Sequence, residues 1–197
     1  MAESKDAKYN SFLRPIPLLA AANLLFFCLE FILALEVRSV SLFSDSIVFL
    51  EGASVSVLMS PKLNWSAPGG REAFARFSRT MLLIPTCFMF WMIAANYFGA
   101  EIPSAAPLAT TGAVLLLANI TFLFKLSRGM FSHLAGSLSH IRIHAIMNTA
   151  IVLAAFLTWG SGTMWPDVLA GLGILYMNGD AAEHVWLAAR HPSAGVA

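Results

Sequence analysis

Two residues that can bind a metal ion, His144 and Asn148, lie four positions apart in an apolar stretch of the chain. In a helix this spacing puts both side chains on one face, one turn apart. An imidazole nitrogen suits zinc, copper, iron and nickel, whereas an amide oxygen is a weak ligand for these metals. The pair therefore predicts either half of a metal site or a hydrogen bond between two packed membrane helices.

Two further histidines, His133 and His140, precede His144 and extend it into a short string. Such a string can collect metal ions before they enter a membrane. Histidines next to a membrane surface are also commonly just solvated. The sequence leaves both interpretations open.

A second polar group has the i, i+3, i+4 spacing of a single helix face, and it consists of Asp180, Glu183 and His184. These side chains can bind an ion or pair with a basic residue such as Arg128. As catalytic groups they would need a nucleophile or a cofactor motif, and the sequence offers neither. We therefore expect that the chain is not an enzyme.

Acidic residues also fall inside long apolar stretches, at Glu30, Asp45 and Glu51. A carboxyl group at membrane depth is costly, so each one needs a partner or a function. No partner for Glu30 is visible in the sequence, and we expect its carboxyl group to be hydrogen-bonded to a neighbouring helix. Glu36 and Asp167 are predicted to lie near the outer interface, where water solvates them.

The elements that position these residues follow from the composition. Of the 197 residues, 58% are hydrophobic and only 12% are charged, about half the charged fraction of a soluble domain. So few charges cannot cover a water-facing surface, which predicts lipid as the surrounding solvent. The net charge of +1 argues against nucleic-acid binding, which needs a concentrated basic face. Cys28 and Cys87 are predicted to be small buried hydrophobic residues.

Each membrane span needs about 20 mostly apolar residues to cross ~30 Å of hydrocarbon. The stretches that qualify are Ile16–Leu35, Val40–Met59, Thr80–Phe98, Pro107–Phe124, Ile141–Trp159 and Trp165–Leu187. The first of them is too long for a signal-peptide core, so we expect it to be retained as a span. The prediction is an all-α, six-helix transmembrane bundle over residues 16–187, with tails at 1–15 and 188–197.

The basic residues predict the orientation, because lysine and arginine gather on the cytoplasmic side of a membrane protein. With the amino terminus inside, only Arg38 is placed outside. The residues placed inside are Lys5, Lys8, Arg14, Lys62, Arg71, Arg76, Arg79, Lys125, Arg128, Arg142 and Arg190. We expect an integral protein of a bacterial inner membrane with both termini in the cytoplasm.

One of the inner segments, Arg71–Arg79, alternates basic and aromatic residues. We predict that it lies along the inner headgroup surface, with Phe74 and Phe77 inserted among the lipids. Binding of a partner protein is the alternative for this segment.

A family resemblance runs through both halves of the chain. Its first part consists of Asn23-Leu-Leu-Phe-Phe and Ser41-Leu-Phe-Ser-Asp-Ser-Ile-Val-Phe-Leu-Glu-Gly-Ala-Ser54. Its second part consists of His144-Ala-Ile-Met-Asn148 and Trp165-Pro-Asp-Val-Leu-Ala-Gly-Leu. Together these segments resemble the cation diffusion facilitator family, and most closely its short members that lack the cytoplasmic carboxy-terminal domain.

The resemblance implies export of divalent cations, mostly zinc, in exchange for protons. The metal site of the family is tetrahedral, with two ligands from the second span and two from the fifth. His144 and Asn148 match the fifth-span pair. The second-span ligands are expected at Val48 and Gly52, neither of which can bind a metal.

Two acidic residues of the second span are candidates to replace the missing ligands. Counting ~1.5 Å per residue from the outer ends puts Glu51 at the depth of Asn148, and puts Asp45 ~9 Å closer to the outside. Glu51 would need a rotated helix to face His144. The predicted site for Zn²⁺ or another divalent cation therefore contains His144, Asn148 and Glu51, completed by Asp45 or water.

Two functions follow, with the lipid bilayer and a homodimer or a larger membrane complex as partners. The first is a proton-coupled divalent-cation exporter with an altered metal site. The second is a family relative that has lost transport and serves as a structural subunit of a membrane complex. Val48 and Gly52 favour the second, and Gly171 and Gly173 would then allow a close approach between helices.

Overall fold

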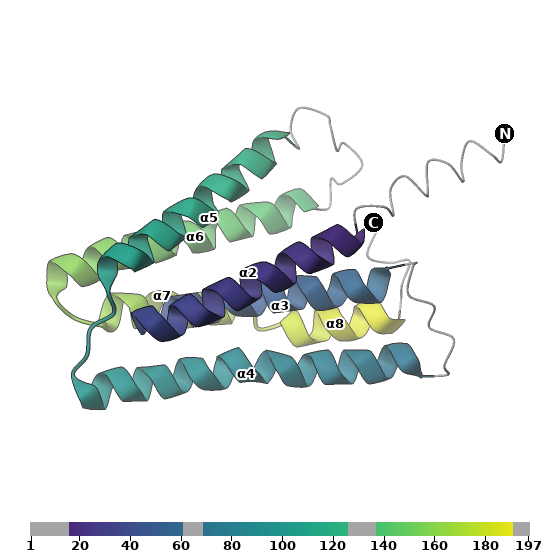
Figure 1. Ribbon diagram of the computed structural model, residues 1–197, viewed down its shortest axis with the longest axis horizontal. Helices are drawn as coiled ribbons and strands as arrows, with labels where there is room; N and C mark the ends of the chain where they lie inside the picture. Colours follow the sequence, from purple (N-terminus) through teal and green to yellow (C-terminus); the bar gives the residue numbers. More distant parts are fainter. Residues whose placement is uncertain (1–15, 61–68, 126–136, 191–197) are drawn as a thin grey trace.

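The computed structural model describes residues 16–60, 69–125 and 137–190, and every regular element in these ranges is an α-helix (Figure 1). The helices are α2 (Ile16–Val37), α3 (Val40–Met59), α4 (Gly70–Gly99), α5 (Ala105–Lys125), α6 (Ser137–Ser161), α7 (Trp165–Met177) and α8 (Ala181–Arg190). The stretches long and apolar enough to cross a membrane are Pro17–Val37, Val40–Met59, Gly70–Gly99 and His144–Ser161. An all-α fold with membrane-spanning helices is thereby confirmed.

The outer surface of the bundle is rich in large apolar side chains. Leu18 on α2, Phe90 on α4 and Leu157 on α6 are all exposed. Lipid tails solvate such side chains at no cost, whereas water would not. Cys28 and Cys87, predicted to be buried, are free thiols on this exposed surface. That prediction was wrong because a small apolar side chain suits lipid as well as a protein core.

The chain turns sharply between α2 and α3. Arg38 adopts a left-handed conformation with φ of 61°, and Ser39 caps α3 by accepting a hydrogen bond from the Leu42 amide at 3.2 Å. The two helices run antiparallel, with α4 below them and the α5–α6 hairpin above them in Figure 1. We call the end of the bundle that holds residues 38–39, 100–104 and 162–164 the hairpin end.

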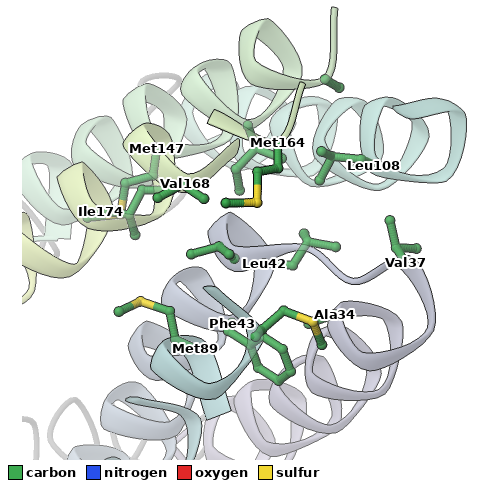
Figure 2. Packing of buried hydrophobic residues seen from close by; sticks show 14 residues of the cluster. Ala34, Val37, Leu42, Phe43, Met89, Leu108, Met147, Met164, Val168 and Ile174 are labelled. Atoms are coloured by element: carbon green, nitrogen blue, oxygen red, sulfur yellow. The ribbon is translucent and has the colours of Figure 1, made fainter. Parts of the chain in front are cut away.

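The opposite end of the bundle, which holds Arg71, Arg79 and Arg190, is named here the basic end. Toward this end α5 rises away from α2 and α6 (Figure 1). The main buried cluster joins the helices closer to the hairpin end, with side chains from α2 to α7 (Figure 2). Its members include Ala34, Leu42, Phe43, Met89, Leu108, Met147, Val168 and Ile174. The α5–α6 hairpin is therefore attached most firmly at the hairpin end.

Helix α4 is longer than the predicted third span, which began at Thr80. It starts at Gly70 and has 30 residues, which makes it about 45 Å long. The Arg71–Arg79 segment is thus the first part of α4, and its position at the inner headgroup surface remains a prediction. Phe74 packs against buried residues of α3 and α8, while Phe77 is exposed. No glycine or proline separates this segment from the span, so one helix runs through both.

The predicted sixth span, Trp165–Leu187, is not one helix. It divides into α7, with 13 residues, and α8, with 10 residues. Residues 178–180 form the turn between them, where the Asn178 amide bonds to the carbonyl of Ile174 at 3.1 Å. Asn-Gly sequences favour such turns, and Asn178-Gly179 supplies one inside an otherwise apolar stretch. The break places His184 on a separate short helix and Asp180 in the turn directly before it.

Candidate functional site

The most unusual polar residues of the bundle are Glu30 on α2 and Asp45 on α3. Their exposed fractions are 2% and 0%, and their carboxyl groups are close enough to interact electrostatically. Within the described residues, none of the four carboxyl oxygens makes a hydrogen bond of normal distance and angle. Burial of two such groups without compensation is expensive, so the pair is a candidate functional site.

The packing of α2 against α3 explains why these carboxyl groups meet. A Cβ atom added at Gly52 would lie 3.2 Å from the Asn23 side chain, so Asn23 and Gly52 face each other across the two helices. Glu30 follows Asn23 by seven residues, and Asp45 precedes Gly52 by seven. Because seven residues are about two helical turns, antiparallel helices with this contact must also bring Glu30 opposite Asp45.

The α5–α6 hairpin contributes Asn148, which is fully buried. Its amide nitrogen donates to the backbone carbonyl of His144 at 2.9 Å. Its amide oxygen has no hydrogen-bond partner in the described parts of the chain. Asn148 thus offers an uncompensated acceptor, as Glu30 and Asp45 do.

The height of Asn148 relative to Asp45 follows from one aromatic contact. The rings of Phe49 and His144 lie 5.9 Å apart. Asp45 is one turn from Phe49 toward the hairpin end, and Asn148 is one turn from His144 in the same direction. Asp45 therefore lies at about the height of the helical turn that holds His144 and Asn148. The sequence-based depths, which put Asp45 closer to the outside, were wrong because they assumed that α3 and α6 begin level.

Glu51, the other predicted acidic ligand, is engaged elsewhere. Its Oε1 lies 2.7 Å from Nδ1 of His184 on α8, and His184 Nε2 lies 3.2 Å from Oδ2 of Asp180. Asp180 and His184 are thus on one side of the chain, as predicted, and His184 contacts Glu51 of α3 from there.

The other residues of the predicted polar groups do not join this contact in the described chain. Glu183 is exposed. Arg128 and His133 lie outside the described residues, as does the side chain of His140.

The four predicted metal ligands are consequently not gathered at one point. Asp45 is next to Glu30, and Glu51 is paired with His184. Among the described residues, no group of three or more histidine, cysteine, aspartate or glutamate side chains could hold a metal ion. Val48 packs against the main buried cluster, so this expected ligand position is used for packing.

Asp167 has a structural role that the sequence-based prediction missed. It is fully buried, not solvated at the interface. It accepts hydrogen bonds from the Ser39 hydroxyl at 2.8 Å, the Ser41 hydroxyl at 2.5 Å and the Val40 amide at 2.6 Å. A carboxylate at the start of a helix is stabilised by the free amides and by the helix dipole. Asp167 therefore holds the start of α7 against the start of α3 by hydrogen bonds.

Comparison with other proteins adds no family to this description. No known family model matches the chain, and no functionally characterised protein matches it. The similarity to cation diffusion facilitators remains a prediction from the residues that carry it. Functional inference consequently starts from the buried polar groups of α2, α3 and α6.

Proposed function

We propose that the protein exchanges a divalent cation for protons across the membrane at a site built around Glu30 and Asp45. The observation that carries this proposal is the burial of both carboxyl groups side by side, where within the described chain each carboxyl group has only the other as an interaction partner. Two carboxylates in an apolar interior need two positive charges. Two protons or one divalent cation supply that charge equally well, and this equivalence makes exchange possible.

The groups available to the cation are the Glu30 and Asp45 carboxylates and the Asn148 amide oxygen. Oxygen ligands suit hard divalent cations, and an imidazole nitrogen such as that of His144 would favour zinc. Zinc is also the cation that the family resemblance implies, so it is the first to test. Glu30, which the resemblance does not supply, would compensate for Val48 and Gly52.

The arrangement of the helices supports alternating access to this site. Glu30 and Asp45 belong to the α2–α3 hairpin, whereas Asn148 belongs to the α5–α6 hairpin. In the second hairpin, α5 rises away from α2 toward the basic end (Figure 1). Rocking of one hairpin against the other would add or remove the Asn148 oxygen and would change which side the site faces. We propose that the basic end is cytoplasmic, as the positive-inside rule predicts, and that the membrane is a bacterial inner membrane.

A flux measurement tests the proposal. Purified protein in proteoliposomes, with a pH gradient and a zinc-sensitive dye inside, should carry Zn²⁺. Glu30→Gln and Asp45→Asn should each abolish this flux, because one carboxylate cannot balance a divalent charge. Glu36→Gln is the matched control, since Glu36 lies on the same helix but is exposed, and its flux should equal that of the parent. Equal flux in all four proteins would refute a role for the buried pair.

A structural subunit is the second candidate, favoured by the use of Val48 and Gly52 for packing. Gly171 does not serve a partner, because a Cβ there would lie 2.9 Å from the Val40 backbone of the same chain. Gly173 has nothing within 4 Å and remains available for one. Purification in mild detergent distinguishes the two functions. Stable co-purification of other membrane proteins, without Zn²⁺ binding, would favour the subunit.

A further inference from the structure

A continuous chain of titratable groups leads from the surface of α8 to α3. His184 stands between two carboxyl groups, with Nδ1 at 2.7 Å from Glu51 and Nε2 at 3.2 Å from Asp180. The exposed fractions of the side chains fall along this chain, from 59% at Asp180 to 39% at His184 and 15% at Glu51. An imidazole held in this way has one nitrogen directed at water-accessible acid and the other at a nearly buried one.

The inner end of this chain, Glu51, belongs to the same helix as Asp45 of the buried pair. Glu51 is followed by Gly52, where Asn23 of α2 packs. Two turns further toward the hairpin end along the same α2–α3 contact lie Glu30 and Asp45. The Asp180–His184–Glu51 chain is thus on the basic-end side of the buried pair.

An aromatic layer lies next to the buried pair, one turn from Asp45 toward the basic end. Phe49 lies between Asp45 and Gly52 in the sequence of α3. Its ring packs against the rings of Phe26 on α2 and His144 on α6, with centroid distances of 5.4 Å and 5.9 Å. Because α2, α3 and α6 each contribute one ring, a shift of the α5–α6 hairpin would loosen this layer. In the present conformation these rings pack together beside the buried pair.

We propose that Asp180, His184 and Glu51 form a proton relay between water at the basic end and the Glu30–Asp45 site. This role rests on the cation–proton exchange proposed above and supplies its proton path. A proton on the Glu51 carboxyl passes to Nδ1 of His184 as the proton on Nε2 passes to the Asp180 carboxylate. The imidazole keeps its charge in this step, and the reverse sequence carries a proton inward.

The charges around His184 are compatible with such a relay. Glu51 faces it from α3 and Asp180 from the turn before α8. On α4, the neighbouring cation is Arg79, whose guanidinium lies 5.5 Å from the Trp186 ring, and Arg190 covers the same ring at 4.7 Å. Both arginines therefore lie against Trp186, two residues along α8 from His184.

The test compares variants of the full chain in proteoliposomes, with Zn²⁺ flux followed over a range of internal pH. His184→Gln keeps a side chain that can hydrogen-bond to both carboxyl groups but cannot relay a proton. We expect its flux to fall about tenfold or more and to lose the dependence on pH that the parent shows. Its equilibrium binding of Zn²⁺ should be unchanged, because the buried pair is intact.

Glu183→Gln is the matched control for Asp180→Asn, since Glu183 lies in the first turn of α8 and Asp180 directly precedes α8, with its carboxylate 3.2 Å from His184. Asp180→Asn should slow flux, whereas Glu183→Gln should not. A parent-like pH profile in His184→Gln would overturn the relay and leave the proposed exchange standing. A parent that carries no Zn²⁺ would overturn both. Loss of Zn²⁺ binding in His184→Gln would also overturn the relay, because it would assign His184 to the cation site.

Discussion

At the scale of single residues, the buried carboxyl groups divide into two kinds. Asp167 is surrounded by hydroxyl and amide donors from the start of α3, so its burial is fully compensated. Glu30 and Asp45 are buried as deeply but have only each other. A compensated carboxylate stabilises a fold, whereas an uncompensated pair lowers stability and is retained where it has a function. This contrast assigns Asp167 to structure and Glu30 with Asp45 to chemistry.

The structural role of Asp167 predicts a loss of stability on truncation. Asp167→Ala leaves the Val40 amide and two serine hydroxyls without their acceptor, which should cost about 2–4 kcal/mol of unfolding free energy. The measurement is the thermal unfolding midpoint in detergent. Glu101→Gln is the control, because the Arg38–Glu101 ion pair is exposed and should contribute little. An unchanged midpoint for Asp167→Ala would mean that α7 is held to α3 by other contacts.

At the scale of elements, α3 is the helix on which the account depends. Its hairpin-end terminus is capped by Asp167, its middle holds Asp45 and Phe49, and its basic-end half carries Glu51. Helices α2, α6, α7 and α8 each approach a different one of these residues. The break at Asn178-Gly179 is what allows α8 to approach α3 with its own orientation.

The aromatic layer predicts a leak when it is opened. Phe49→Ala removes the central ring of this layer next to Asp45, so water from the basic end should reach the buried pair. We expect proteoliposomes with this variant to dissipate a pH gradient in the absence of Zn²⁺. Phe90→Ala is the control, because Phe90 is an exposed ring on α4. A pH gradient held equally well by both variants would show that the rings do not seal the site.

The two glycines of α7 give a matched pair of packing variants. A Cβ at Gly171 would lie 2.7 Å from the Val40 side chain and 2.9 Å from its carbonyl oxygen, whereas one at Gly173 meets nothing within 4 Å. Gly171→Ala should therefore lower the unfolding free energy by about 1–3 kcal/mol. Gly173→Ala should leave it unchanged or slightly higher. If the two variants unfolded at the same temperature, the close approach of α7 and α3 would be in doubt.

At the scale of the whole molecule, the sequence predicted the class of fold and most helix positions, because apolar stretches of span length are a local signal. It missed the division of the sixth span, where two turn-forming residues outweigh the apolar residues around them. It could not predict that Glu30 meets Asp45 or that Glu51 meets His184. Those contacts depend on how each helix is rotated and how high it sits against its neighbours, which spacing within one helix does not specify.

The orientation of the whole chain remains a prediction with a direct test. In a background of Cys28→Ala and Cys87→Ala, cysteines introduced as Arg38→Cys and Arg190→Cys mark the hairpin end and the basic end. A membrane-impermeant maleimide should label intact cells at position 38 only, and both positions after lysis. Labelling of position 190 in intact cells would reverse the orientation.

The measurement that tests the central claim most directly is proton release on cation binding. Zn²⁺ is titrated into the purified protein in weak buffer, with bound metal and released protons counted together. The account predicts that binding of each Zn²⁺ releases protons, up to about two per ion. Glu30→Gln and Asp45→Asn should each lose both the binding and the proton release. Binding of Zn²⁺ that survives both substitutions with its proton release unchanged would contradict the account.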